Sequence, residues 1–185
     1  MDAGFGIEDR MTKALIIIDV QKAMFEQAAL QPFDGEAVVV RIADLISRAR
    51  SQGAPVFYVQ HDGGPDDSFG AGKPGFLFVD AIAPLPGDDV TVKTKSSAFH
   101  GTDFEARLKS AGIDHLVITG MQSEYCITSA IRGAYERGYR LTLVSDAHST
   151  FDTKFAKGKG IVAIVNDTTR DSFGDVTPAS EIDFA

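Results

Sequence analysis

A single thiol lies near the middle of this 185-residue chain. Cys126 is the only cysteine, and it follows the apolar run HLVIT at residues 115–119 and the glycine at position 120. Such a run is typical of a buried strand, and the residues after Ser123 have helical spacing. Cys126 therefore falls at a strand-to-helix turn, where it is either a small core residue or a reactive nucleophile.

Two further kinds of ionisable group follow predicted strands. Asp19 comes after the apolar residues of ALIIIDV, and Lys93 and Lys95 come after the run VTV in DVTVKT. A carboxylate could accept the proton of a thiol, and a lysine beside it could hold its negative charge. This combination suits acyl transfer through a thioester. Both lysines share one strand face by two-residue periodicity, so the pattern alone does not choose between them.

The expected turn around Cys126 also predicts how its thiol is activated. Ser123 has the side chain of a helix cap, which would place Cys126 in the first helical turn. The N-terminus of a helix favours the thiolate and so predicts a lowered pKa for Cys126. The backbone N–H groups of the same turn could stabilise an oxyanion.

Strands that alternate with helices must position these groups. Apolar runs predict strands at residues 14–20, 55–61, 89–94, 115–119 and 140–147, and helical spacing predicts helices at 36–52, 104–111 and 127–137. Residues 161–165 fit a helix or a strand, because Gly158 and Gly160 weaken a helix. The alternation predicts one α/β domain over residues 1–185, with a mostly parallel sheet covered on both faces. Ligands of such sheets bind beyond the carboxyl ends of the strands, where the candidate residues lie.

Two segments do not fit regular elements. Residues 62–86 are rich in Gly, Pro, Asp and Phe, and an irregular segment of that length is uncommon unless it covers a site. Residues 1–10 are expected to form a loose leader.

Composition excludes several classes of partner. The chain has 26 acidic against 18 basic residues and a formal net charge of −8, which opposes binding to a phosphate backbone. It has no apolar run of about 18 residues, and its first dozen residues lack the pattern of a signal peptide. We therefore expect a soluble cytoplasmic protein that binds neither nucleic acid nor membranes.

Four segments, taken together, resemble the isochorismatase-like cysteine hydrolases. They are ALIIIDVQKAMF (14–25), VKTKSSAFHGTDFEARL (92–108), GMQSEYCITSAIRGAYERGY (120–139) and LVSDAHSTFD (143–152), in the family order over residues 12–152. The resemblance implies an Asp-Lys-Cys triad on a three-layer α/β/α, Rossmann-like fold. Position matches Asp19 and Cys126 to this triad, and the family spacing of a lysine, three residues and Ser-Ala-Phe selects Lys93.

The resemblance also implies details of the site. A cis peptide bond is expected between Met121 and Gln122, with the backbone amides of Gln122 and Cys126 forming the oxyanion hole. From their apolar character alone, Phe25 and Phe99 are candidates for substrate binding, with the protein core as the alternative for each.

Departures from the family pattern narrow the chemistry. Isochorismate-cleaving enzymes often lack the cysteine, so its presence favours substrates with C–N bonds. Nicotinamidases of the family bind a metal through Asp-x-His and a further His, whereas this chain has only QHDGG at residues 60–64. We therefore predict no metal and no other cofactor, and we interpret His61 as a hydrogen-bonded structural residue.

The sequence thus predicts a cysteine-dependent hydrolase of a small amide, carbamoyl or related C–N substrate. One alternative on the same fold is metal-free hydrolysis of an isochorismate-like vinyl ether. Another is a catalytically silent protein that binds a small molecule. Because relatives are usually dimers or tetramers, the resemblance also implies a homo-oligomer.

Overall fold

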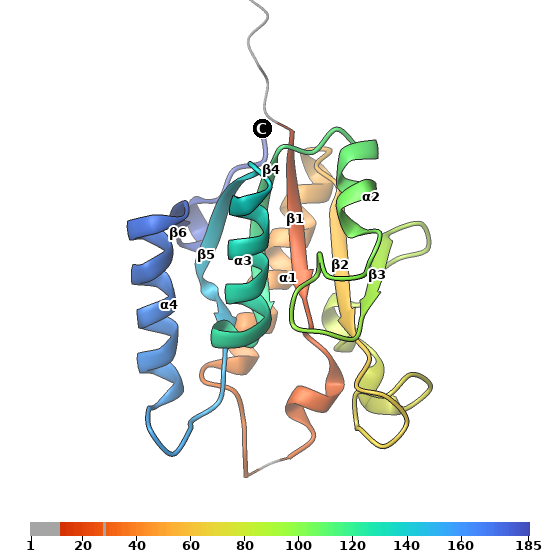
Figure 1. Ribbon diagram of the computed structural model, residues 1–185, viewed down its shortest axis with the longest axis vertical. Coiled ribbons are helices and arrows are strands. Elements are labelled where there is room, and N and C mark those ends of the chain that lie inside the picture. The colour runs from red at the N-terminus through yellow and green to blue at the C-terminus, as the bar shows by residue number, and fades with distance from the viewer. Residues whose placement is uncertain (1–11, 28) are drawn as a thin grey trace, which may run out of the picture.

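A computed structural model describes residues 12–27 and 29–185, and its centre is a parallel sheet of six strands (Figure 1). The strand order is β3-β2-β1-β4-β5-β6, and every pair of neighbours is parallel. The strands are β1 (Lys13–Ile18), β2 (Val56–His61), β3 (Asp89–Lys93), β4 (His115–Met121), β5 (Arg140–Ser149) and β6 (Asp175–Thr177). The predicted leader at 1–10 lies outside the described residues.

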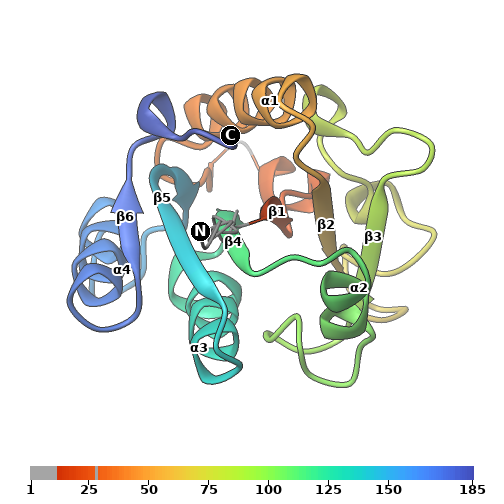
Figure 2. The same ribbon diagram turned by 90° about the horizontal axis from the view of Figure 1, so that it is seen from above.

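Helices cover both faces of the sheet. The helices are α1 (Gly35–Ser51), α2 (Phe104–Ser110), α3 (Thr128–Glu136) and α4 (Gly158–Ser172). Figure 2 shows α1 on one face and α2, α3 and α4 on the other. The structure therefore confirms the three-layer α/β/α fold with a parallel central sheet. No helix of the described chain combines the length and apolar character needed to span a bilayer.

The chain order reverses at the middle of the sheet. From β1 the chain adds β2 and β3 on one side, and it then returns to add β4, β5 and β6 on the other side of β1. At such a reversal the connections leave a crevice beyond the carboxyl ends of the two central strands. β1 and β4 flank this point, so residues just after them are placed to meet a ligand.

Gly120 lets the end of β4 approach β1 closely. It pairs with Ile18, and its φ of 122° is in the region that favours glycine. A Cβ at this position would lie 2.1 Å from the backbone oxygen of Ile18. Any other residue would push the strand ends apart, and with them the turn that carries Cys126.

The structure resolves the ambiguous and irregular segments of the sequence. Residues 161–165 belong to α4, because Val162 and Val165 are buried at helical spacing on the face toward the sheet. Residues 62–86 contain the short 3₁₀ helices η2 (Pro74–Phe76) and η3 (Asp80–Ile82) and an isolated β-bridge from Phe78 to Gln21, in agreement with the predicted irregular segment. The three-residue strand β6 was not predicted, since so short a strand has no periodicity to detect.

Candidate active site

Asp19, Lys93 and Cys126 converge beyond the carboxyl ends of the strands. Asp19 directly follows β1, Lys93 is the last residue of β3, and Cys126 lies in the π-helical turn η4 (Ser123–Ile127) after β4. The Nζ atom of Lys93 is 2.7 Å from Oδ2 of Asp19 and 3.3 Å from Sγ of Cys126. The ammonium group therefore bridges the carboxylate and the thiol.

The structure separates the two candidate lysines. The side chain of Lys93 is fully buried with that of Asp19, whereas Lys95 is exposed. β3 ends at Lys93, so Lys95 lies in a bend where the two-residue alternation of the strand no longer holds. The lysine chosen by family spacing is the one that pairs with Asp19.

Asp19 has an unusual backbone conformation. Its φ is 52°, a left-handed value that few residues other than glycine, asparagine and aspartate adopt. Its N–H still donates to the backbone oxygen of Val59 at 2.9 Å, so the residue stays attached to β2 while the chain turns. Such outliers are found at functional sites, where the surrounding structure holds them in place.

Burial governs the protonation of the site. Desolvation raises the pKa of Asp19 above its ordinary value, against the positive charge of Lys93. Desolvation, with the negative charge of Asp19 adding to it, raises the pKa of the Cys126 thiol to about 12. The predicted lowering of this pKa is wrong for the free protein, because loss of water outweighs the charge of Lys93. At neutral pH the thiol therefore keeps its proton.

The turn that carries Cys126 differs from the predicted helix start. The N–H of Ile127 donates to the oxygen of Gln122 at 3.2 Å, five residues back, and the N–H of Thr128 donates to the oxygen of Ser123. These bonds define a single π-helical turn, a feature frequent at functional sites. The peptide bond between Met121 and Gln122 is cis.

Ser123 does not cap this turn, so that prediction is wrong. Its hydroxyl lies 2.8 Å from Nδ1 of His148, and Nε2 of His148 lies 3.0 Å from Oδ1 of Asn166. Nδ2 of Asn166 donates to the oxygen of Ser145, so Oδ1 is the acceptor for the imidazole N–H. Nδ1 is then left to accept the proton of the Ser123 hydroxyl. This relay joins the turn to β5 and α4.

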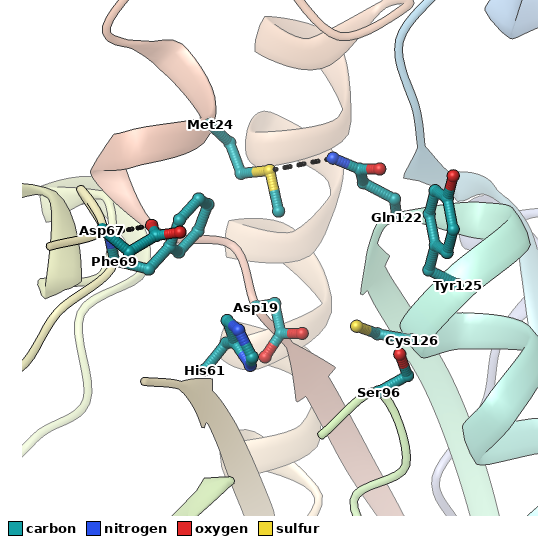
Figure 3. Close-up of a pocket in the computed structure, with 9 residues that line it drawn as sticks. All are labelled: Asp19, Met24, His61, Asp67, Phe69, Ser96, Gln122, Tyr125 and Cys126. Atoms are coloured by element: carbon teal, nitrogen blue, oxygen red, sulfur yellow. Dashed lines mark hydrogen bonds between the residues drawn. The ribbon is translucent and has the colours of Figure 1, made fainter. Parts of the chain in front are cut away.

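A cavity of about 260 Å³ is lined by Asp19 and Cys126 (Figure 3). The irregular segment 62–86 supplies two of its lining residues, as expected for a segment that covers a site. The lining consists of Asp19, Met24, His61, Asp67, Phe69, Ser96, Gln122, Tyr125 and Cys126.

Neither Phe25 nor Phe99 lines this cavity. Phe99 is buried beneath α3 and α2, with its ring 5.1 Å from that of Phe104 in an edge-to-face contact. Phe25 packs against the core on the α1 side and borders a separate hollow beside Val39. Met24, directly before Phe25, contributes instead, because the short 3₁₀ helix η1 (Lys22–Phe25) turns that side chain toward the site.

His61 faces the cavity rather than the core. Its backbone is fixed by Gln21, whose side chain accepts the N–H of His61 at 2.9 Å and donates to its oxygen at 3.0 Å. The imidazole lies against the ring of Phe69, and its Nδ1 is buried without a hydrogen-bond partner among the described residues. Desolvation and the charge of Lys93 lower the pKa of His61, so the ring is neutral near pH 7. The predicted hydrogen-bonded role thus applies to its backbone and not to this ring nitrogen.

Residues 13–179 match the family model described as the isochorismatase domain. The chain belongs to the isochorismatase family.

Two curated relatives and one solved structure illustrate the range of the isochorismatase family. Streptothricin hydrolase from Streptomyces noursei is 36% identical over 149 residues, which cover 80% of this chain and 59% of the relative. Ureidoacrylate amidohydrolase RutB from Methylorubrum extorquens is 30% identical over 174 residues, covering 75% of this chain and 70% of the relative. An isochorismatase from Pseudomonas putida KT2440, known from a crystal structure, is 29% identical in sequence. The superposition covers 93% of this chain and 90% of that isochorismatase, with a TM-score of 0.87. The chain is an isochorismatase-like hydrolase in a family that includes amidohydrolases.

Proposed function

We propose that this protein hydrolyses a small amide, carbamoyl or related C–N compound through a thioester on Cys126. The observation that carries the proposal is the bridge formed by Lys93, 2.7 Å from Asp19 and 3.3 Å from the only thiol, beneath a cavity. Relatives named streptothricin hydrolase and ureidoacrylate amidohydrolase support cleavage of a C–N bond.

In the first half of the reaction Asp19 acts as the general base. It takes the proton from Sγ of Cys126 as the sulfur attacks the substrate carbonyl carbon, and the C=O electron pair moves to the oxygen. Lys93 holds Asp19 in its charged form before this step and stabilises the developing thiolate. The N–H groups of Gln122 and Cys126 stabilise the oxyanion in this proposal.

The second half returns the site to its starting state. The tetrahedral intermediate collapses, the C–N bond breaks, and the proton held by Asp19 passes to the leaving nitrogen. A water molecule then attacks the thioester while Asp19 accepts its proton, the C–S bond breaks, and Cys126 recovers its thiol. The sum is one amide and one water converted into one acid and one amine.

The cavity limits the size of the substrate. Its volume of about 260 Å³ lies just below the range of about 300–1,000 Å³ that is usual for ligand pockets. A compact acyl or carbamoyl group fits such a space better than a long chain. We therefore propose that the enzyme selects its substrates by a short substituent next to the scissile bond.

The test is a screen of small amides and N-carbamoyl compounds for ammonia release, with Cys126→Ala as the blank. We expect the substitution to lower turnover more than about 10³-fold, because removal of a nucleophile ends covalent catalysis. Acid-quenched wild-type protein should carry an acyl group on Cys126 in its mass spectrum. Turnover near the wild-type rate in Cys126→Ala would contradict the covalent mechanism, and a protein that only binds its ligand would form no adduct.

A further inference from the structure

Among residues 12–27 and 29–185, the cavity lining carries one uncompensated charge, and that charge is negative. No lysine or arginine of this described part of the chain lines the cavity, and the one histidine there that does, His61, is neutral. The charge of Asp19 is balanced by Lys93 in a buried ion pair. Asp67 has no such balance, since the ion pairs formed by residues 12–27 and 29–185 do not include it.

The local structure fixes the position of the Asp67 carboxylate. Its Oδ1 accepts the N–H of Phe69 at 2.9 Å, and its backbone N–H donates to the oxygen of Gly64 at 3.2 Å. The carboxylate also lies over Gly63, where a Cβ would come within 2.6 Å of Asp67 Cγ. Glycine at position 63 leaves space for this carboxylate, and the hydrogen bond from the N–H of Phe69 orients it at the exposed edge of the cavity.

His61 lies between this carboxylate and the catalytic centre. Figure 3 shows Asp67 and Phe69 on one side of the cavity, Gln122, Tyr125 and Cys126 on the other, and His61 with Asp19 between the two groups. The buried Nδ1 of His61 lacks a partner among the described residues. A buried polar atom without a hydrogen bond costs free energy, so a ligand that supplies one is favoured.

We propose that Asp67, His61 and the ring of Phe69 form a donor subsite that binds an amino or ammonium group of the substrate. The carboxylate and a neutral imidazole nitrogen accept N–H bonds, and the face of an aromatic ring attracts a cation. The subsite lies across the cavity from Cys126, and in this proposal the nitrogen is carried on the acyl side of the scissile bond. A substrate with a carboxylate at this place meets the like charge of Asp67 and is rejected.

This inference rests on the proposed hydrolase and deepens it by naming the charge class of the substrate. Its test compares three amides of matched length that end in an ammonium, a methyl and a carboxylate group: 4-aminobutanamide, pentanamide and succinamate. Ammonia release gives kcat/KM for each compound. We expect the wild type to prefer 4-aminobutanamide, then pentanamide, then succinamate.

Two neighbouring aspartates provide a matched pair of variants. Asp66 and Asp67 are both exposed and carry the same formal charge, but only Asp67 lines the cavity. Asp67→Asn should reduce the ratio of kcat/KM for 4-aminobutanamide over succinamate by about 10-fold or more, the size expected for hydrogen bonds to a charged group. Asp66→Asn should leave the ratio near its wild-type value. Equal ratios in the two variants, or a wild type that prefers succinamate, would overturn the subsite.

A binding measurement separates this inference from the proposed reaction. Calorimetry with the three compounds on Cys126→Ala, alone and combined with Asp67→Asn, measures the charge preference without turnover. Stronger binding of 4-aminobutanamide that is lost with Asp67→Asn supports the subsite even if none of the three is hydrolysed. Equal binding of the three compounds, together with ammonia release that depends on Cys126, would reject the subsite but not the proposed hydrolase activity.

Discussion

Lys93 and Asp19 have fully buried side chains that form an ion pair with each other. Lys93→Ala should lower turnover at least about 10²-fold, the range for a positioned acid–base group. It should also lower the free energy of unfolding by about 3–5 kcal/mol, because it leaves the carboxylate of Asp19 buried and unpaired. Turnover on the amide found in the screen and thermal melts measure the two effects.

Lys95→Ala is the matched control for this substitution. Lys95 is exposed two residues away, so its removal should change stability by less than about 0.5 kcal/mol and leave turnover near wild type. An inactive Lys95→Ala beside an active Lys93→Ala would mean that the buried ion pair does not support catalysis.

The convergence of Asp19, Lys93 and Cys126 could be predicted from sequence because the carboxyl ends of parallel strands meet at one edge of a sheet. Asp19, Lys93 and Cys126 each follow an apolar run, and family spacing distinguished the lysines. The pKa of the thiol was not accessible, because it depends on how much water the folded turn excludes. The lining residues Met24 and Tyr125 were missed for a similar reason, since short 3₁₀ and π turns decide where those side chains point.

At the scale of elements, the turn η4 shows how tertiary contacts override a local pattern. Serine before an apolar helical face predicts a cap, yet the hydroxyl of Ser123 bonds to His148, which lies in β5. His148 follows Ser123 by 25 residues, and no spacing rule links the two. Helix α4 was ambiguous in the sequence because its glycines lower the local preference for a helix. The segment is nevertheless helical, because the helix buries Val162 and Val165 against the sheet.

The relay through His148 makes the stability of the fold sensitive to acid. Desolvation lowers the pKa of His148, so the folded protein keeps this imidazole neutral while the unfolded chain protonates it below about pH 6.5. Stability is therefore unaffected by this group above pH 6.5 and falls as the pH drops below it. At pH 5.5 the loss of unfolding free energy from one such histidine is at most about 1.4 kcal/mol.

A variant without the ionisable group at position 148 tests this contribution of His148 to the pH dependence of stability. His148→Gln keeps hydrogen-bonding groups but cannot be protonated in this pH range, so its melting temperature should fall less between pH 7.5 and 5.5 than that of the wild type. The pKa values of His61 and His115 are lowered in the same direction, so the variant should retain part of the pH dependence. Identical pH dependence in both proteins would show that His148 is protonated in the folded state or does not control stability.

At the scale of the whole molecule, the sequence predicted the layers but not the order of the strands. Alternating apolar runs and helical faces require a parallel sheet covered on both sides. The reversal between β1 and β4 depends on which strands pair with each other. Strand pairing is set by contacts between residues far apart in the sequence, so local periodicity does not predict it. The sequence predicted five of the six strands. It did not predict β6, because the three residues of this strand are only partly buried at the edge of the sheet.

We expect the reaction to be independent of metal ions. The segment QHDGG lacks the paired histidine of metal-binding relatives, and residues 12–27 and 29–185 contain no group of three or more His, Cys, Asp or Glu side chains placed to hold an ion. Dialysis against EDTA should therefore leave kcat and KM within error of the untreated protein. A loss of activity that zinc restores would instead support nicotinamidase-type chemistry.

The cavity holds the only sulfhydryl of the chain. Labelling with a thiol-specific reagent is therefore confined to one atom per chain, and the labelled fraction counts the chains whose thiol is accessible. A fluorine-bearing alkylating group at this atom would give one resonance at the wall of the cavity. Cys126 thus serves as a stoichiometric titrant and a spectroscopic reporter, without any cysteine having to be removed elsewhere.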